Sequence, residues 1–270
     1  MTAKQKDLTR QLTVIVTFSL TLVANGLAAT VGLNGLTTGE ISDLLPSYFT
    51  PAGWAFSIWS VIYTGLIAYT IYQALPGQRS NPVLRRSGWL FSASSLTNAA
   101  WIIAWHYGVA DYWLSVLLMV GILALLLAIY IRLAIGRPQA GLSWADRLLV
   151  HLPFSIYFGW ISVATVANVA SAGVFAGWGG FGIAAPTWAI IMILVAAGIA
   201  GVVLLGRANL PYAAVFVWAL LAIRDQQGAA EPAIATATLI AAALVIIAAL
   251  VGYARVYLRP GRPARLRPTA

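Results

Sequence analysis

Few residues of this 270-residue chain could carry acid–base, covalent or metal chemistry. The two histidines, His106 and His151, fall near opposite ends of two apolar stretches, so they cannot share one metal ion. Cysteine is absent, which excludes disulfides, thiolate catalysis and cysteine-ligated metals. The only lysines, Lys4 and Lys6, lie in the N-terminal tail, so no apolar stretch offers an amine for a Schiff base. No nucleophile–base pair, paired carboxylate or glycine-rich phosphate loop occurs at a usable spacing, and an enzyme is the least favoured class.

The placement of tryptophan is more informative. The chain has 11 tryptophans, and most fall toward the side of the apolar stretches that is poor in lysine and arginine: Trp54, Trp59, Trp101, Trp105, Trp113, Trp178 and Trp188. A belt at the membrane surfaces would populate both sides, but the opposite side has only Trp89 and Trp144. The asymmetry favours an aromatic cavity that opens outward, on the side poor in lysine and arginine, and that is suited to a flat, mostly apolar ligand held by stacking. Asn98 and Asn168 fit the wall of such a cavity, and hydrogen bonding between helices explains them equally well.

The elements that must position these residues are membrane-spanning helices. The chain is 61% hydrophobic and only 9% charged, with a mean hydropathy of +0.86, so it cannot cover a water-facing surface. A soluble enzyme and a disordered protein are both excluded. Eight stretches approach the roughly 20 apolar residues that a bilayer requires: about 12–35, 52–75, 88–107, 112–134, 148–170, 186–206, 210–225 and 233–257. The sequence therefore predicts an all-α polytopic bundle with eight spans, of which the seventh is the shortest.

The charges predict the orientation of this bundle. With eight spans, all 16 lysines and arginines except Arg224 fall on one side, which we call the basic side. The opposite side, the acidic side, carries Glu40, Asp43, Asp111, Asp225 and Glu231. By the positive-inside rule the basic side and both termini are cytoplasmic, and an odd number of spans would break this segregation. The net charge of +9 is thus a topology signal and not a nucleic-acid footprint. We interpret the first stretch as a span and not a cleaved signal peptide, because it is long and no A-x-A site ends it.

Three segments, in order, resemble one known family. They are TPAGWAFSIWSVIY (50–63), LTNAAW (96–101) and PFSIYFGWISVATVAN (153–168). The first resembles the Pro/Trp-rich second helix of the TspO/MBR family, which comprises the bacterial tryptophan-rich sensory proteins and the mitochondrial translocator protein. The second is similar to the L-x-N-x-x-W of that family, and the third to its W-x-x-x-A-T-x-x-N ending. The resemblance covers residues 8–170, the length of the family's five-helix unit.

The resemblance implies a pocket among helices one, two, three and five, capped by the first loop, that binds porphyrins, haem or sterol-like ligands. Carried over by position, the pocket residues are Trp54, Phe56, Trp59, Asn98, Trp101, Trp160, Ala164 and Asn168. Ala164 lies one turn from Trp160, where a small residue leaves room for a ring system.

The chain departs from the family pattern in two places. The second-helix motif has one residue fewer between Phe56 and Trp59, which would rotate Trp59 by about 100°. The last three spans have no counterpart in the five-helix unit, and their small residues, such as Ala197 and Gly201, allow tight packing. We therefore divide the chain into a five-helix unit, three additional helices and a basic tail, at residues 1–175, 176–257 and 258–270.

The leading hypothesis is a receptor-like membrane protein with a sensory or regulatory role, which binds a tetrapyrrole or another planar hydrophobic ligand. The first alternative is a transporter of such ligands, and the second alternative is a porphyrin-modifying enzyme. No cofactor is required under these hypotheses, and a porphyrin or haem would be bound as the ligand. The expected partners are membrane lipid, the hydrophobic ligand and a second copy of the chain, with no nucleic acid. We expect the bacterial inner membrane as the location.

Overall fold

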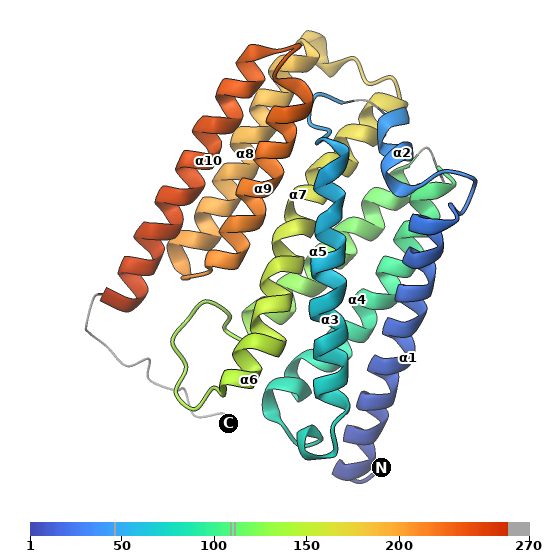
Figure 1. Cartoon of the computed structure of the whole chain (residues 1–270), viewed down its shortest axis with the longest axis vertical. Helices are drawn as coiled ribbons and strands as arrows, with labels where there is room; N and C mark the ends of the chain where they lie inside the picture. Colours follow the sequence, from blue (N-terminus) through green and yellow to red (C-terminus); the bar gives the residue numbers. More distant parts are fainter. Residues whose placement is uncertain (46, 109, 111, 259–270) are drawn as a thin grey trace.

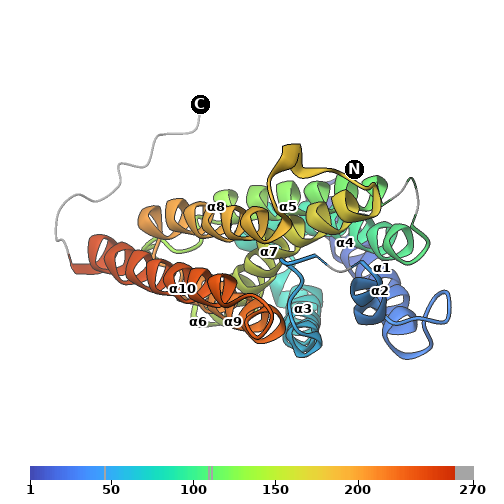
Figure 2. The ribbon, with the colours of Figure 1, turned by 90° about the horizontal axis from the view of Figure 1, so that it is seen from above.

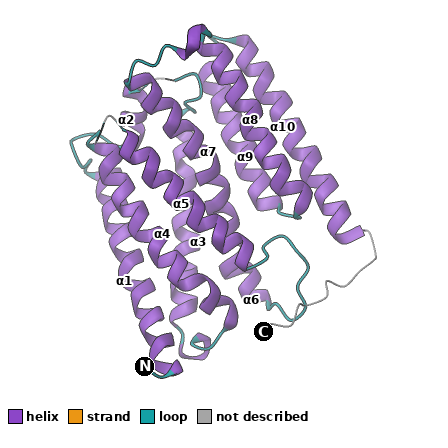
Figure 3. Ribbon diagram, turned by 180° about the vertical axis from the view of Figure 1, so that it is seen from behind, coloured by secondary structure: helices purple, strands orange, loops and turns teal. Residues whose placement is uncertain are grey.

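The computed structural model describes residues 1–258 except 46, 109 and 111 (Figure 1). These residues form helices and connecting loops, with no strand among them (Figure 3). Each of the eight apolar stretches contains one long helix: α1 (Ala3–Thr30), α3 (Ile58–Ala74), α4 (Pro82–His106), α5 (Trp113–Arg132), α7 (Leu152–Phe175), α8 (Ala185–Gly206), α9 (Leu210–Gln227) and α10 (Pro232–Tyr253). The shorter elements are α2 (Thr38–Leu44), α6 (Trp144–Asp146), the 3₁₀ turns η1 (Gly53–Ser57), η2 (Pro76–Gln78) and η4 (Gly180–Gly182), and the π-helical turns η3 (Arg147–His151) and η5 (Ala254–Leu258).

By length and composition, the helices able to cross a membrane are α1, α3 with η1, α5, α7 with α6 and η3, α8, and α10 with η5. The chain is therefore a polytopic helical membrane protein. The helices α4 and α9 lie alongside these six (Figure 1), and their crossing remains a prediction from the sequence. The low hydropathy of α4 has a structural cause, since its buried face carries Ser87, Ser92, Ser94, Ser95 and Asn98. The 18 residues of α9 span about 27 Å, and the last turns are polar.

The helix α7 lies at the centre of the bundle (Figure 2). It packs against α3, α5 and α9, and Trp160, Ile161 and Phe158 are among its many buried residues. On one flank α1 packs on α4, and α4 packs on α5; on the other, α8 and α9 pack on α10. The five-plus-three division of the chain fits this arrangement and remains an interpretation.

The alternation of the long helices separates the charges as the sequence predicts. The N-terminus of α1, the loops after α3, α5 and α8, and the end of α10 lie on the basic side, whereas α2 and the loops after α7 and α9 lie on the acidic side (Figure 1). An ion pair between Arg85 and Asp7 joins α4 to α1 on the basic side. The predicted acidic-side residue Asp111 and the tail residues Arg259, Arg262, Arg265 and Arg267 lie outside the described residues.

The closest helix contact in the C-terminal part joins α8 and α10, at a different position from the one expected. A Cβ atom at Gly201 would meet nothing within 4 Å, so the pair Ala197 and Gly201 does not mark the closest approach. A Cβ atom at Gly252 of α10, in contrast, would overlap the backbone carbonyl of Leu204 on α8. Ala200 of α8 and Ala241 of α10 are also fully buried. Small residues thus allow tight packing here, as they commonly do in membranes.

Candidate functional site

A small aromatic cavity lies between η1, α3, α4 and α7, under the short helix α2. Its volume is about 50 Å³. Six of the eight predicted pocket residues line it: Phe56, Trp59, Trp101, Trp160, Ala164 and Asn168. The other lining residues are Thr38, Ser42, Pro51, Trp105, Met119, Val163, Ala167 and Ser171. The fold therefore brings together residues that are more than 100 positions apart in the chain.

Trp59 faces this cavity despite the shortened motif. The 3₁₀ turn η1 ends at Ser57, so only one residue step between Phe56 and Trp59 has the wider 3₁₀ rotation of about 120°. This step recovers about 20° of the roughly 100° that the missing residue removes. Trp59 stacks on Trp101, with ring centroids 6.2 Å apart and planes 28° apart.

The indole rings form a continuous aromatic wall. The ring of Trp101 also stacks on Trp105 at 6.3 Å and 20°. The edge of Trp160 meets Trp59 at 6.2 Å and 82°, and Phe56 meets Trp160 at 6.1 Å and 80°. Parallel and edge-on pairs of this kind present flat π faces as well as ring edges to the space between them. This wall is suited to a planar ring and offers it no full charge.

One polar group on the wall has no partner. The indole N–H of Trp160 is buried and makes no hydrogen bond with any described residue. The indole N–H of Trp101, in contrast, donates to the side-chain oxygen of Asn168 at 3.4 Å, and the amide of Asn168 donates to Ser115 at 3.0 Å. A buried donor without an acceptor is destabilising, and it marks a position where a ligand acceptor would be favoured.

A short cap closes the cavity on the acidic side. The helix α2 begins with a capping box, in which Thr37 and Glu40 exchange side-chain and backbone hydrogen bonds. These hydrogen bonds from Thr37 hold the pKa of the Glu40 carboxyl below its ordinary value. Thr38 then hydrogen-bonds the Nε2 atom of His106 at 3.1 Å, and its backbone carbonyl accepts from Trp105 at 3.5 Å. His106 is thus a locally hydrogen-bonded residue that anchors the cap.

Two predicted pocket residues lie elsewhere. Asn98 is fully buried; its side-chain oxygen accepts a hydrogen bond from Asn25 at 2.8 Å, and its side-chain amide donates one to Tyr157 at 3.0 Å. Its role in the structure is therefore hydrogen bonding between helices, which the sequence offered as the alternative to lining the cavity. Trp54 is 41% exposed and points away from the cavity toward α9. Its ring meets Trp218 edge-on at 4.7 Å, and its indole N–H donates to Asp225 at 2.9 Å.

The helix α9 holds the whole segment that precedes α3. The indole N–H of Trp218 donates to the carbonyl of Ala55 at 3.2 Å, and the backbone N–H of Ala52 donates to the carbonyl of Ala222 at 3.0 Å. The side chain of Gln227 donates to the carbonyl of Thr50 at 3.0 Å. The segment 47–55 is therefore fixed to one of the three additional helices.

Several cavity residues were not predicted. Trp105 and Ser171 follow Trp101 and Asn168 by four and three positions, so helical periodicity could have found them. Thr38 and Ser42 reach the cavity through the path of the first loop, for which the sequence carries no signal. His151 lies at the opposite end of the bundle, and the described residues include no group of three histidines, cysteines or carboxylates that could hold a metal ion.

Fold and site together define a polytopic helical membrane protein with an aromatic cavity between its helices. Residues 11–251 match the sequence profile of the family described as TSPO-like protein, so the chain belongs to that family. The match takes in α8 and α9 and nearly all of α10. Membership implies a ligand-binding, sensory or transport role in a membrane. No curated protein and no solved structure was found to match the chain.

Proposed function

We propose that this protein is a receptor-like sensor that binds a tetrapyrrole, or another planar hydrophobic ligand, in the aromatic cavity. The observation that carries the proposal is the unpaired indole N–H of Trp160, buried beside the stacked rings of Trp59 and Trp101. Flat π faces would hold the ligand ring, and the free N–H would hold a carboxylate, carbonyl or ring nitrogen on it.

Binding requires the cavity to widen. Its volume of about 50 Å³ is far below the roughly 300–1,000 Å³ of ordinary ligand sites. The cap is the element that would move, because α2 has only seven residues and few side-chain hydrogen bonds attach it to α4. The small side chains of Ala164 and Ala167 on α7 leave the opposite wall free of bulk.

The test is a titration with protoporphyrin IX of the protein in phosphatidylcholine nanodiscs, followed by the Soret shift of the ligand. Replacing Trp160 by phenylalanine removes the N–H and keeps an aromatic ring. We expect its Kd to rise about tenfold, which corresponds to one net hydrogen bond. Ala164→Phe fills the cavity and should abolish binding. Trp144→Phe is the matched control, because Trp144 is 68% exposed on the basic side.

Two results would refute the proposal. One is the absence of a saturable Soret shift with the unmodified protein. The other is equal affinity in the Trp160, Ala164 and Trp144 variants, provided that all three elute as folded protein. Ligand movement across the bilayer is a separate question, because no described contact favours transport over binding.

We further propose that the basic side faces the cytoplasm and that the membrane is the inner membrane of a bacterium. Supporting this is the segregation of charge, in which Arg10, Arg85, Arg132 and Arg207 belong to helix ends and loops on one side of the bundle and Glu40 to α2 on the other.

A further inference from the structure

A second and larger cavity lies between the five-helix unit and the additional helices. Its volume is about 820 Å³, which is within the range of ordinary ligand sites. The helices α5 and α8 lie on the same side of the molecule with α7 between and behind them (Figure 2). Residues of all three line the cavity, together with the segment 47–49 and the loop between α7 and α8. It lies at the acidic side of the bundle and is separate from the cavity around Trp160.

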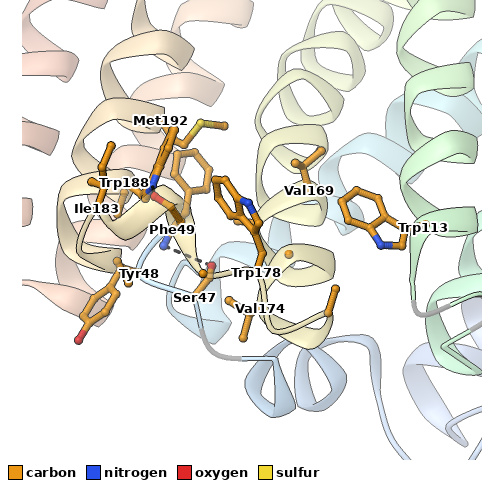
Figure 4. Close-up of a pocket in the computed structure, with 17 residues that line it drawn as sticks. Ser47, Tyr48, Phe49, Trp113, Val169, Val174, Trp178, Ile183, Trp188 and Met192 are labelled. Carbon is orange, nitrogen blue, oxygen red and sulfur yellow. Dashed lines mark hydrogen bonds between the residues drawn. The ribbon is translucent and has the colours of Figure 1, made fainter.

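Indole rings form much of the wall of this cavity, and residues with small side chains form much of its floor. Figure 4 shows Trp178 between Trp188 on one side and Trp113 on the other. The floor is formed by the small residues Gly173, Ala170, Ala185 and Ala189 and by the larger Val169 and Met192, and Phe49 and Ile183 also line the cavity. A Cβ atom at Gly173 would already lie 3.7 Å from the ring of Trp178, so any longer side chain there would project into the space that this ring faces. The cavity therefore combines flat indole faces with several small residues of α7 and α8.

The loop between α7 and α8 holds one of the indoles in place. The indole N–H of Trp188 donates to the carbonyl of Gly180 at 2.8 Å. Gly180 has a φ of +62°, and a Cβ atom there would lie 3.1 Å from the Trp188 ring. A side chain at this position would strain the backbone and crowd the indole, so this hydrogen bond favours glycine. The ring of Trp178 lies 5.1 Å from that of Trp188, at an angle of 52°. Trp178 is half exposed, and its indole N–H has no partner among the described residues.

The lining offers no charged partner to an anionic ligand. No lysine, arginine, aspartate or glutamate is among the described residues that line this cavity. An anionic group would find no cation, and the acidic side as a whole offers only Arg224. The indole N–H of Trp178 can only donate, so an acceptor on the ligand would complement it. The apolar floor of α7 and α8 continues toward the membrane interior, where it suits an apolar tail.

We propose that the cavity between α5, α7 and α8 binds an uncharged lipid whose flat aromatic or quinoid ring bears carbonyl or ether oxygens and an apolar tail. The ring lies among Trp113, Trp178 and Trp188, and one of its oxygens accepts from the N–H of Trp178. The tail follows the small residues of α7 and α8. The lipid enters sideways from the half of the bilayer at the acidic side. This site does not depend on ligand binding near Trp160.

The experiment uses decylubiquinone as the probe and the full-length protein in phosphatidylcholine nanodiscs. Quinones quench indole fluorescence at contact, so a bound quinone gives saturable quenching above the linear background from quinone dissolved in the bilayer. Ala170→Phe fills the floor and should raise the Kd at least tenfold. Trp178→Phe changes a half-exposed side chain and should raise it about fivefold. The matched control is Ala164→Phe, on the same helix but in the other cavity, which should leave quinone binding unchanged.

The pattern across the variants decides the outcome. Saturable quenching that Ala170→Phe and Trp178→Phe weaken, and Ala164→Phe does not, supports the proposal. Linear quenching that is equal in every protein overturns it, because it means that acyl chains fill the cavity and the three tryptophans form only a surface belt. Equal loss with Ala164→Phe also overturns it, since the quinone would then occupy the cavity around Trp160. Protoporphyrin binding, measured in parallel, reports separately on the proposed function.

Discussion

Replacing Gly252 by alanine tests how α10 is held against the rest of the bundle. The new Cβ atom would overlap the carbonyl oxygen of Leu204 and lie 2.9 Å from its carbonyl carbon, whereas ordinary contacts begin at 3.4 Å. Both obstructing atoms belong to the backbone, so no side-chain rotation can relieve the overlap. The nearer oxygen sets the displacement, so the two helices must separate by about 1 Å or more along this seam. Overpacking of this kind costs roughly 1–3 kcal/mol.

The net effect combines this cost with a gain from helix propensity. Alanine favours a helix over glycine by about 1 kcal/mol. Because backbone obstructs the new atom, we take the upper end of the overpacking range and expect a net loss of about 2 kcal/mol in the free energy of unfolding. Gly201→Ala is the matched control, because nothing lies within 4 Å of its Cβ position and only the gain remains. Unfolding in mixed micelles by added sodium dodecyl sulfate, followed by tryptophan fluorescence, measures both variants. Equal stability of the two variants would refute the packing argument.

Two further predictions concern the interior and the orientation. Asn98→Leu leaves the hydroxyl of Tyr157 without its buried hydrogen-bond donor. We expect this variant to lower the free energy of unfolding, measured as above, by about 1–2 kcal/mol. An unchanged free energy of unfolding would contradict the role of this hydrogen bond. Because the chain has no cysteine, Ala229→Cys and Lys6→Cys give clean probes of the two sides. In intact bacterial cells a membrane-impermeant maleimide should label only Ala229→Cys, and labelling of Lys6→Cys before lysis would reverse the proposed orientation.

The long helices could be predicted from the sequence because a bilayer imposes a length on every apolar stretch. Even the short seventh stretch, which begins at Leu210, is a continuous helix. The contacts between the helices were harder to predict from the sequence. Ala197 and Gly201 have the spacing of a helix contact, but the closest approach is at Gly252, because the rotation of each helix about its axis depends on all its neighbours.

The aromatic cavity was predictable only in part. Trp59, Trp101 and Trp160 stand in the three segments that resemble the family, so their meeting was expected from that resemblance. Trp54 lies before α3, where no helical period constrains it, and contact with α9 turns it outward. The volume of the larger cavity depends on how α8 leans on α7, a relation between distant segments that periodicity does not contain.

The contacts of α9 with the segment 47–55 bear on how the chain is built. Ending the protein after the fifth long helix would remove the hydrogen-bond partners of Thr50, Ala52, Trp54 and Ala55 together. The stretch of sequence most typical of the family is thus, in this chain, partly a docking surface for helices that the five-helix unit lacks. The three additional helices are therefore not a separate appendage, because they hold the segment 47–55 in place.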